Sequence, residues 1–223
     1  MREPLPVNRA TSPKQGPFGG FRKKTYRLEE LVRQLAVLVP RTPAIVSVWV
    51  RKRLDPLFRE EIMVAVARTN ACRFCNFVHG QWALTAGLTP EELERVGRPG
   101  GPSPDPERSL ALDYAQALAA ADFGAVPEHL ERQVRERFGA QRQRDIETVA
   151  RVMTLANLSA NTLDALLSRT RGVPSGHSRL VDELVIGAGF LVVYPVMILL
   201  LAVMQRRAPW SVWRDFLQSG QDP

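Results

Sequence analysis

The chain has 223 residues, of which 45% are hydrophobic, and this is enough apolar material for one sizeable domain with appendages. Its net charge is +7, but no basic face interleaved with aromatic residues accompanies that charge, so no nucleic-acid partner is expected. Two cysteines are too few for the disulfide framework of a small secreted protein. Contact with anionic lipid headgroups is the simpler use of the excess positive charge.

Residues 1–24 combine several prolines and glycines with six basic residues and one acid. They lack the apolar stretch of a cleavable signal peptide. This composition is typical of a flexible basic arm.

Helical signals then follow one another as far as residue 170. Apolar residues recur at helix spacing, and prolines, capping residues and glycines mark the ends of segments. Helices are expected over residues 28–39, 42–53, 56–70, 72–86, a short segment opened by a capping box at Thr89, 106–121, 127–138 and 141–169. No alternating β-branched run indicates a strand. We therefore predict an all-α domain of about seven or eight helices over residues 25–170.

The C-terminal part contains a long uncharged segment. Residues 171–182 are interpreted as a linker, and residues 184–204 carry no charged side chain. At ~1.5 Å per residue such a segment covers roughly 30 Å, the thickness of a bilayer core. We predict a single transmembrane helix at 183–205 followed by a short tail, 206–223. A buried core helix is the alternative.

Two features bear on the orientation of this membrane segment. Trp210 and Trp213 follow it, and they are typical of residues that lie at a membrane interface. Lysines and arginines near the segment balance on its two sides, so the positive-inside rule does not decide. The basic arm favours a cytoplasmic position for the main domain, and the expected localisation is a single-pass membrane protein.

The two cysteines, Cys72 and Cys75, form a Cys-x-x-Cys pair. Such a spacing lowers thiol pKa and suits reversible redox exchange. A helix that starts near Cys72 directs its backbone N–H groups at the sulfurs and leaves Cys72 the more exposed. His79 lies four residues after Cys75, on the same helix face, where it can accept a proton from the Cys75 thiol directly or through water.

A carboxylate precedes the pair. Glu60 lies in an otherwise apolar stretch, so its pKa should be raised and it could hold or shuttle a proton. Glu61 points about 100° away around the helix and is expected to be solvated. Two thiols, an imidazole and a half-buried carboxylate fit thiol peroxidase chemistry, in which a thiolate attacks a hydroperoxide, the second thiol forms a disulfide, and a dithiol partner restores both.

Two other functions of the Cys72–Cys75 segment, zinc binding and haem attachment, fit the sequence less well. The four side chains are possible zinc ligands by type, but a second Cys-x-x-Cys or Cys-x-x-His is missing. Covalent haem is excluded because Asn76, not histidine, follows Cys75. No metal and no cofactor are expected. His177 has no partner pattern and is expected to be solvated, whereas Asn161 and Asp164 are expected to tie helices together.

The segment Glu60–His79 has the pattern Glu-x11-Cys-x2-Cys-x3-His. With residues 59–68, 86–92 and 156–165, it resembles the alkylhydroperoxidase D (AhpD)-like branch of the carboxymuconolactone decarboxylase superfamily. The resemblance covers about residues 28–170. A bare Cys-x-x-Cys is common, but glutamate and histidine at these offsets are not, so the pattern is specific.

The resemblance implies an all-α fold that assembles into trimers or larger rings. It implies that Cys75 attacks, Cys72 resolves, and Glu60 and His79 form the proton relay. It also implies reduction of alkyl hydroperoxides and recharging by a lipoyl- or thioredoxin-type dithiol protein. Phe74, between the cysteines, departs from the family pattern because it cannot pass a proton. The membrane segment is not part of the pattern either.

Two further functions fit the sequence. One is a carboxymuconolactone decarboxylase-like lyase, which acts on lactone acids and needs no thiol pair. The other is a non-enzymatic, redox-sensing scaffold tethered to a membrane. With the membrane segment, the peroxidase interpretation extends to lipid hydroperoxides as substrates.

Overall fold

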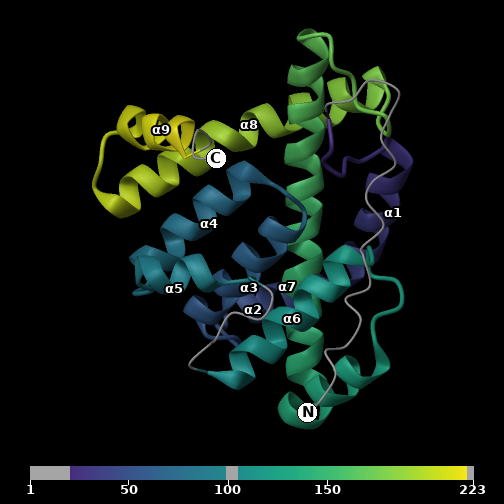
Figure 1. The fold of residues 1–223 in the computed structure, drawn as a ribbon, viewed down its shortest axis with the longest axis vertical. Coiled ribbons are helices and arrows are strands. Elements are labelled where there is room, and N and C mark those ends of the chain that lie inside the picture. Colours follow the sequence, from purple (N-terminus) through teal and green to yellow (C-terminus); the bar gives the residue numbers. More distant parts are fainter. Residues whose placement is uncertain (1–20, 99–104, 220–223) are drawn as a thin grey trace, which may run out of the picture.

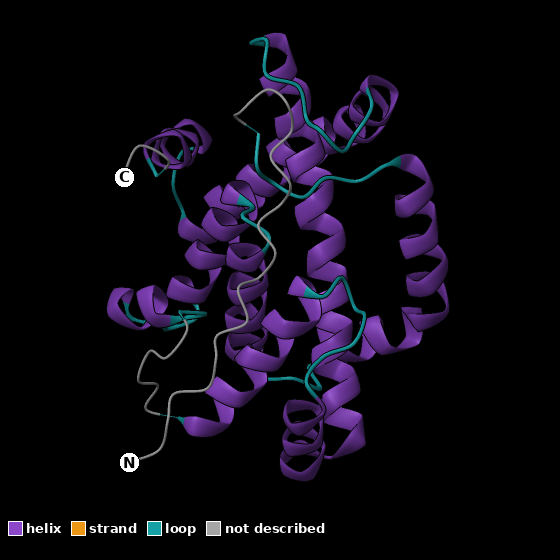
Figure 2. Ribbon diagram, turned by 45° about the vertical axis from the view of Figure 1, so that its right-hand side comes forward, coloured by secondary structure: helices purple, strands orange, loops and turns teal. Residues whose placement is uncertain are grey.

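The computed structural model describes residues 21–98 and 105–219, and within these ranges the chain forms helices and loops but no strand (Figure 2). The all-α prediction is therefore confirmed. Most of the basic arm predicted over residues 1–24 lies outside the described residues, as do the loop at 99–104 and the last four residues.

The helices begin close to where the sequence signals predict them. Asp55 caps its helix by accepting the Phe58 N–H at 2.9 Å, and Thr89 exchanges hydrogen bonds with Glu92 in the predicted capping box. In chain order the elements are α1 (Leu28–Leu38), the 3₁₀ turn η1 (Val39–Arg41), α2 (Thr42–Trp49), α3 (Pro56–Thr69), α4 (Arg73–Thr85), α5 (Pro90–Arg95), α6 (Pro106–Ala120), α7 (Glu128–Thr170), α8 (Leu180–Gln205) and α9 (Pro209–Gln218).

The longest element, α7, runs the full height of the molecule in Figure 1. The sequence predicts two helices here, separated near Gly139. The structure has one long element with a break at that glycine, whose φ of 74° and ψ of 162° are not helical. This backbone conformation favours glycine because it has no Cβ. The helices α1, α2, α3, α4, α6 and α8 all contact α7, so it organises the domain.

The core surrounds α3, which contacts α4, α6 and α7. Side chains on every side of α3 are buried, which explains its nearly continuous apolar sequence between Ile62 and Ala67. The fully buried apolar side chains of the described residues include Leu54, Ile62, Val64, Val66, Tyr114, Ile146 and Met153.

The start of α8 is fixed by two buried acids, Asp182 and Glu183. Glu183 accepts hydrogen bonds from Arg169 of α7 at 2.6 and 2.9 Å, and Asp182 accepts the Leu28 N–H of α1 at 3.1 Å. Buried carboxylates are stable only when paired in this way. The helix therefore begins at Leu180, within the segment interpreted as a linker, and its first turn is part of the domain.

Past these acids, α8 is long and apolar enough to cross a membrane, and so is the stretch Leu28–Trp49. One side of α8, with Ile186, Phe190 and Leu201, is buried against the domain. The opposite side exposes a row of aliphatic residues: Leu184, Val185, Leu191, Val192, Val196, Leu199, Leu200 and Val203. Although most of α8 is thus exposed, it lies against the domain along its buried side.

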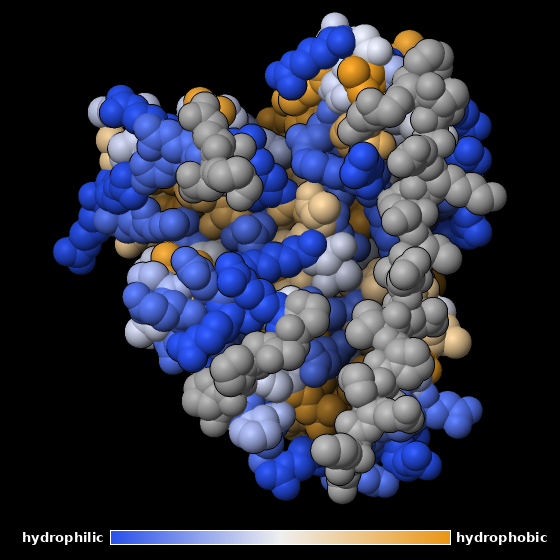
Figure 3. Space-filling model, in the orientation of Figure 1, coloured by the Kyte–Doolittle hydropathy of each residue, from blue (hydrophilic) through white to orange (hydrophobic). Residues whose placement is uncertain are grey.

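The predicted tail contains a helix that the sequence analysis missed. In α9, Val212 and Phe216 are buried, and the chain reverses at Arg206, whose φ is 52°. Figure 1 shows α8 and α9 side by side beyond α4. In this arrangement α8 packs against both α4 and α9. The face seen in Figure 3 is mainly hydrophilic, with hydrophobic residues visible chiefly in recesses between helices.

The close approach of α8 to α7 gives a test of this packing. A Cβ added at Gly187 would lie 3.4 Å from the Leu163 Cα and 3.4 Å from its Cδ1, whereas one added at Gly189 would meet nothing within 4 Å. A Gly187→Leu substitution should therefore lower the free energy of unfolding by about 1–3 kcal/mol, measured by denaturant unfolding. Gly189→Leu is the matched control and should not destabilise; equal effects of the two would contradict the packing.

Candidate active site

The thiols lie at a tight turn between α3 and α4. Ala71 has a φ of 52°, and the Cys72 N–H donates to the Ala67 carbonyl at 2.9 Å. The Asn70 carbonyl accepts a hydrogen bond of 2.8 Å from Nδ2 of Asn161, a residue of α7. The turn is thus held both by its own backbone and by the central helix.

Cys72 is the N-cap of α4, as the sequence predicts, and the Cys75 N–H donates to its Sγ at 3.4 Å. Both thiols are free. The expectation that Cys72 is the more exposed is wrong, since its exposed fraction is 2% and that of Cys75 is 5%. The reason is that α4 packs against both α7 and α8, which cover its start.

Glu60 and His79 meet across the α3–α4 pair. The His79 Nδ1 lies 2.7 Å from the Glu60 Oε2, and both side chains are buried. Arg59 donates to the other carboxylate oxygen at 3.2 Å, and the Trp82 ring stands edge-on to the imidazole with centroids 5.0 Å apart. Because Nδ1 is engaged by the carboxylate, Nε2 is the ring nitrogen left to exchange a proton.

The imidazole and the sulfurs share one face of α4. Among the described residues no hydrogen bond joins His79 to Cys75 or Cys72. The structure thus brings together the carboxylate with the imidazole, and the two thiols with each other, as two adjacent pairs. A proton passing between the pairs needs a water molecule or a substrate as a bridge.

The thiols are covered by an aromatic cluster from the C-terminal helices. The Phe74 ring stacks on Tyr194 with centroids 3.7 Å apart, and it meets Phe190 and Phe216 edge-on at 6.3 and 5.4 Å. Arg73 donates to the Phe216 carbonyl at 2.7 Å and lies over the Phe216 ring. Phe74 therefore has a role the sequence did not suggest: it fastens α8 and α9 over the thiol turn.

The family model described as carboxymuconolactone decarboxylase family matches residues 45–103. This stretch is similar to that family. The match contains α3, α4 and α5, and with them all four predicted site residues. No curated protein and no solved structure matches the chain significantly.

Burial controls the protonation of Cys72. Burial and a hydrogen bond with Cys75 raise the pKa of the Cys72 thiol well above its ordinary value. Cys72 is therefore held as a neutral thiol, whereas a nucleophilic cysteine has to be ionised. The resolving role that the resemblance implies for Cys72 stays a prediction.

The expectation that Glu61 is solvated is wrong. Its carboxylate is buried and receives a hydrogen bond of 2.8 Å from Arg108, at the start of α6. Burial raises the pKa of Glu61 despite the nearby guanidinium. Since α3 is surrounded by helices, a rotation of 100° from Glu60 leads into a second interface and not to solvent.

Other polar predictions have mixed outcomes. Asn161 ties α7 to the end of α3 through the Asn70 carbonyl, and it also donates to the Lys24 carbonyl at 3.0 Å. Asp164 pairs with Lys23 at 2.6 Å, and because Lys23 is not in a helix this contact does not join two helices. These two contacts hold the last residues of the predicted flexible arm against the domain. His177, expected to be without a partner, lies 2.9 Å from Glu30.

Among the described residues, no group of three or more histidine, cysteine, aspartate or glutamate side chains could hold a metal ion. The sequence reasoning missed the contributions of Asn70 and Tyr194. No sequence signal connects Tyr194 to Phe74, because they are 120 positions apart. Asn70 contacts Asn157 and Asn161. Both lie in residues 156–165, one of the stretches that carry the family resemblance, and this was the available signal for their contribution.

The raised pKa of Cys72 predicts a pH effect on stability. The folded state holds this proton more tightly than the unfolded state, so the free energy of unfolding should fall as the pH rises above about 8.5, by up to roughly 1.4 kcal/mol per pH unit. Denaturant unfolding of the wild type and a Cys72→Ser variant between about pH 7 and 10 would measure it. Wild type should lose more stability than the variant; parallel curves would contradict the assignment.

Proposed function

We propose that this protein is a thiol-dependent peroxidase of the alkylhydroperoxidase D-like type, which reduces alkyl or lipid hydroperoxides through Cys72 and Cys75. The observation that carries the proposal is the buried Glu60–His79 pair at 2.7 Å, on the same two helices as a free Cys-x-x-Cys pair. A structural role alone does not call for an imidazole held by a buried carboxylate beside two reduced thiols.

In the proposed first step, His79 accepts the Cys75 proton through a bridging water, and the Cys75 thiolate attacks the hydroperoxide. The S–O bond forms as the O–O bond breaks, giving a Cys75 sulfenic acid and an alkoxide. The alkoxide takes the proton from the imidazolium and leaves as the alcohol. Glu60 holds the imidazole by Nδ1 and stabilises its charged form throughout.

In the second step the Cys72 sulfur attacks the sulfenic acid sulfur. The disulfide forms, and the leaving hydroxide combines with the Cys72 proton as water. The net result is two thiols and one hydroperoxide converted to a disulfide, one alcohol and one water. A lipoyl- or thioredoxin-type dithiol protein then reduces the disulfide by exchange. The N–H···S contact between Cys75 and Cys72 supports the closeness that this step requires.

Peroxidase turnover with cumene hydroperoxide and a lipid hydroperoxide tests the proposal. Cys75→Ser and Cys72→Ser should abolish turnover, and Glu60→Gln or His79→Gln should lower it about 10²–10⁴-fold, the usual contribution of general acid–base catalysis. Glu61→Gln, which changes the neighbouring buried carboxylate, is the matched control and should retain activity. A sulfenic acid should be trapped on Cys75 in the Cys72→Ser variant.

Two outcomes would contradict this assignment. Turnover no faster than buffer with either hydroperoxide would remove the enzymatic function. Formation of the disulfide by peroxide without repeated turnover would instead favour a redox-sensing scaffold.

A carboxymuconolactone decarboxylase-like lyase is the second candidate. The match of residues 45–103 to that family favours it, as does the burial of both thiols. Such an enzyme would use Glu60 and His79 for proton transfer and would not need the sulfurs. Decarboxylation of a lactone acid that persists in Cys75→Ser and is lost in His79→Gln would support it.

We also propose that α8 holds the protein at a membrane in a single pass, with the thiol domain on the cytoplasmic side. The uncharged run 184–204, the exposed aliphatic row on α8 and the exposed Trp210 support it. Crossing the bilayer would separate α8 from α7 and α4 and would withdraw Tyr194 from Phe74. Insertion and access to the thiols would therefore be coupled.

The membrane proposal predicts different behaviour for opposite faces of the domain. Val192→Glu and Val203→Glu, on the exposed side of α8, should reduce the membrane-bound fraction in cells. Leu167→Glu, an exposed aliphatic on α7, is the matched control and should leave the fraction unchanged. A C-terminal tag protected from protease added to the cytoplasmic side would indicate a span; a fully soluble wild type would contradict the proposal.

The proposed assembly is a trimer or a multiple of one, as in the family that the motif resembles. The exposed aliphatic row on α8 could alternatively be covered by another copy. Light scattering on detergent-solubilised protein, wild type and Val192→Glu, distinguishes these: an assembly that survives the substitution is not formed through α8.

A further inference from the structure

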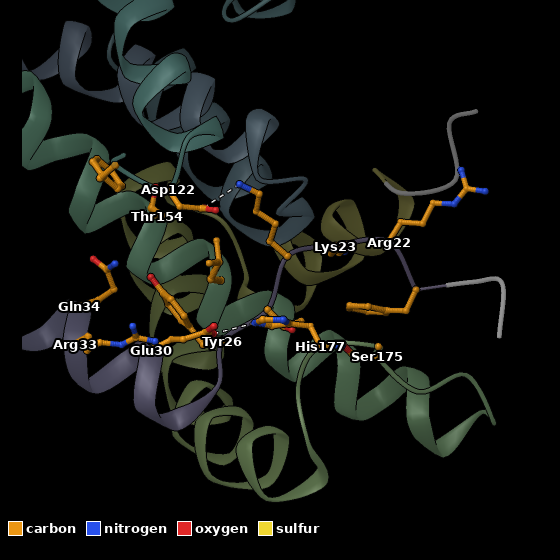
Figure 4. Close-up of a pocket in the computed structure, with 16 residues that line it drawn as sticks. Arg22, Lys23, Tyr26, Glu30, Arg33, Gln34, Asp122, Thr154, Ser175 and His177 are labelled. Atoms are coloured by element: carbon orange, nitrogen blue, oxygen red, sulfur yellow. Dashed lines mark hydrogen bonds and ion pairs between the residues drawn. The ribbon is translucent and has the colours of Figure 1, made fainter. Parts of the chain in front are cut away.

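A cavity of about 700 Å³ lies apart from the thiols (Figure 4). It is bounded by residues 21–26, α1, α7, the loop that follows α6 and the loop at 175–177. None of the four predicted site residues lines it. Its volume is within the range of small-molecule binding sites, which is roughly 300–1,000 Å³.

The acids that line the cavity already have partners within the chain. Glu30 lies 2.9 Å from the His177 ring, and Asp122 accepts a hydrogen bond of 2.9 Å from Lys24. Figure 4 shows the Glu30–His177 pair at the cavity wall. Neither carboxylate is therefore free to receive a cationic ligand.

Two arginines of the cavity, in contrast, have no carboxylate partner among the described residues. Arg33 makes one weak contact, from its Nε to the Glu29 carbonyl at 3.3 Å, which leaves its terminal nitrogens available. Arg22 has no hydrogen bond or ion pair within the described part of the chain. In Figure 4 these arginines lie at opposite sides of the cavity. The uncompensated charge at this site is thus positive, and guanidinium groups bind carboxylate and phosphate through paired hydrogen bonds.

The floor of the cavity offers hydroxyl groups that lack partners. Tyr26 is 5% exposed, and within the described part of the chain its hydroxyl makes no hydrogen bond. In Figure 4 its ring points across the cavity, between Gln34 and Thr154. The neighbouring Thr25 Oγ1 is buried and likewise unsatisfied. A buried polar group without a partner is costly, so a bound molecule or water that hydrogen-bonds to the Thr25 Oγ1 is favoured. The Tyr26 hydroxyl is not fully buried and can donate to the same molecule.

The remaining wall is apolar. Phe21, Phe123 and Leu158 line the cavity beside the hydroxyls. A ligand that satisfies the whole site needs an apolar body for these side chains, an acceptor for the Tyr26 hydroxyl and an anionic group for the arginines. A simple inorganic anion would leave the apolar side chains in contact with water. An uncharged hydrocarbon would leave the two arginines without an anionic partner.

We propose that this cavity binds an amphipathic anion, with an aromatic or aliphatic body and one carboxylate or phosphate group. Arg33 takes the anionic group, Tyr26 donates a hydrogen bond from the floor, and the apolar wall holds the body. The proposal does not rest on the peroxidase function, because the cavity and the thiols share no residue.

Ligand-observed NMR titration of the full-length protein tests the site, with 4-phenylbutyrate and phenyl phosphate as probes and 4-phenylbutanol as the uncharged analogue. We expect at least one anion to bind with a dissociation constant of about 1 mM or tighter, and the alcohol to bind about tenfold more weakly. Preference between the two anions tells a carboxylate ligand from a phosphate one.

Three variants separate the site from non-specific binding. Arg33→Gln should weaken anion binding about tenfold, Arg33→Lys should restore part of it, and Tyr26→Phe should weaken it several-fold without removing the ring. Arg95→Gln is the matched control, because Arg95 is also exposed and also bonds through Nε to the carbonyl four residues earlier. It should leave binding unchanged, and circular dichroism should show all variants folded.

The proposal is overturned if neither anion binds the wild type at millimolar concentration. It is also overturned if the alcohol binds as well as the anions, or if Arg33→Gln and Arg95→Gln have equal effects. Since peroxidase turnover is measured separately, a failure here leaves the proposed thiol chemistry standing, and a failure of that chemistry leaves this site standing.

Discussion

The pairing of α3 with α4, closed by the turn at Asn70 and Ala71, is the constraint on which the site depends. It sets the 2.7 Å contact between Glu60 and His79, which come from different helices. It also makes Cys72 the cap of α4, with the Cys75 N–H directed at its sulfur. A shift of one residue in either helix would rotate a side chain by about 100° and separate the carboxylate from the imidazole. Asn161 protects this register by binding the Asn70 carbonyl from α7.

Buried acids recur throughout the domain, and their partners distinguish a structural role from a chemical one. Glu183 is paired with Arg169, Glu61 with Arg108, and Asp145 with Arg53. A guanidinium keeps its charge at any pH that a folded protein tolerates, so these pairs hold helices together and cannot move protons. Glu60 also contacts an arginine, but among these buried acids it is the one that additionally holds an imidazole, that of His79. This difference supports the proton-transfer role proposed for the Glu60–His79 pair.

The thiol pair presents two opposing requirements. Burial keeps the Cys72 pKa high and protects both sulfurs, whereas peroxide chemistry needs a thiolate and a path for the substrate. The aromatic contacts of Phe74 with Tyr194 and Phe216 resolve the conflict in favour of protection in this conformation. Tyr194, which covers the thiol turn through Phe74, belongs to α8. The opposite side of the same helix carries the exposed aliphatic row for which we propose contact with lipid. Thr154, which lines the cavity, accepts a hydrogen bond of 3.3 Å from Asn70 of the thiol turn.

Local spacing in the sequence was enough to predict the helices and to bring Glu60 and His79 into one candidate site. These signals are local in the sequence. They include the caps Asp55 and Thr89, the break at Gly139 and the Glu60–His79 pattern. The environment of each residue depended on contacts distant in sequence, and there the sequence misled. Glu61 is buried by Arg108, Cys72 is covered by α7 and α8, and the expected tail folds into α9. These points depend on the tertiary structure, because the burial of a residue is set by which helices pack together. No local sequence pattern predicts that Phe74 stacks on Tyr194.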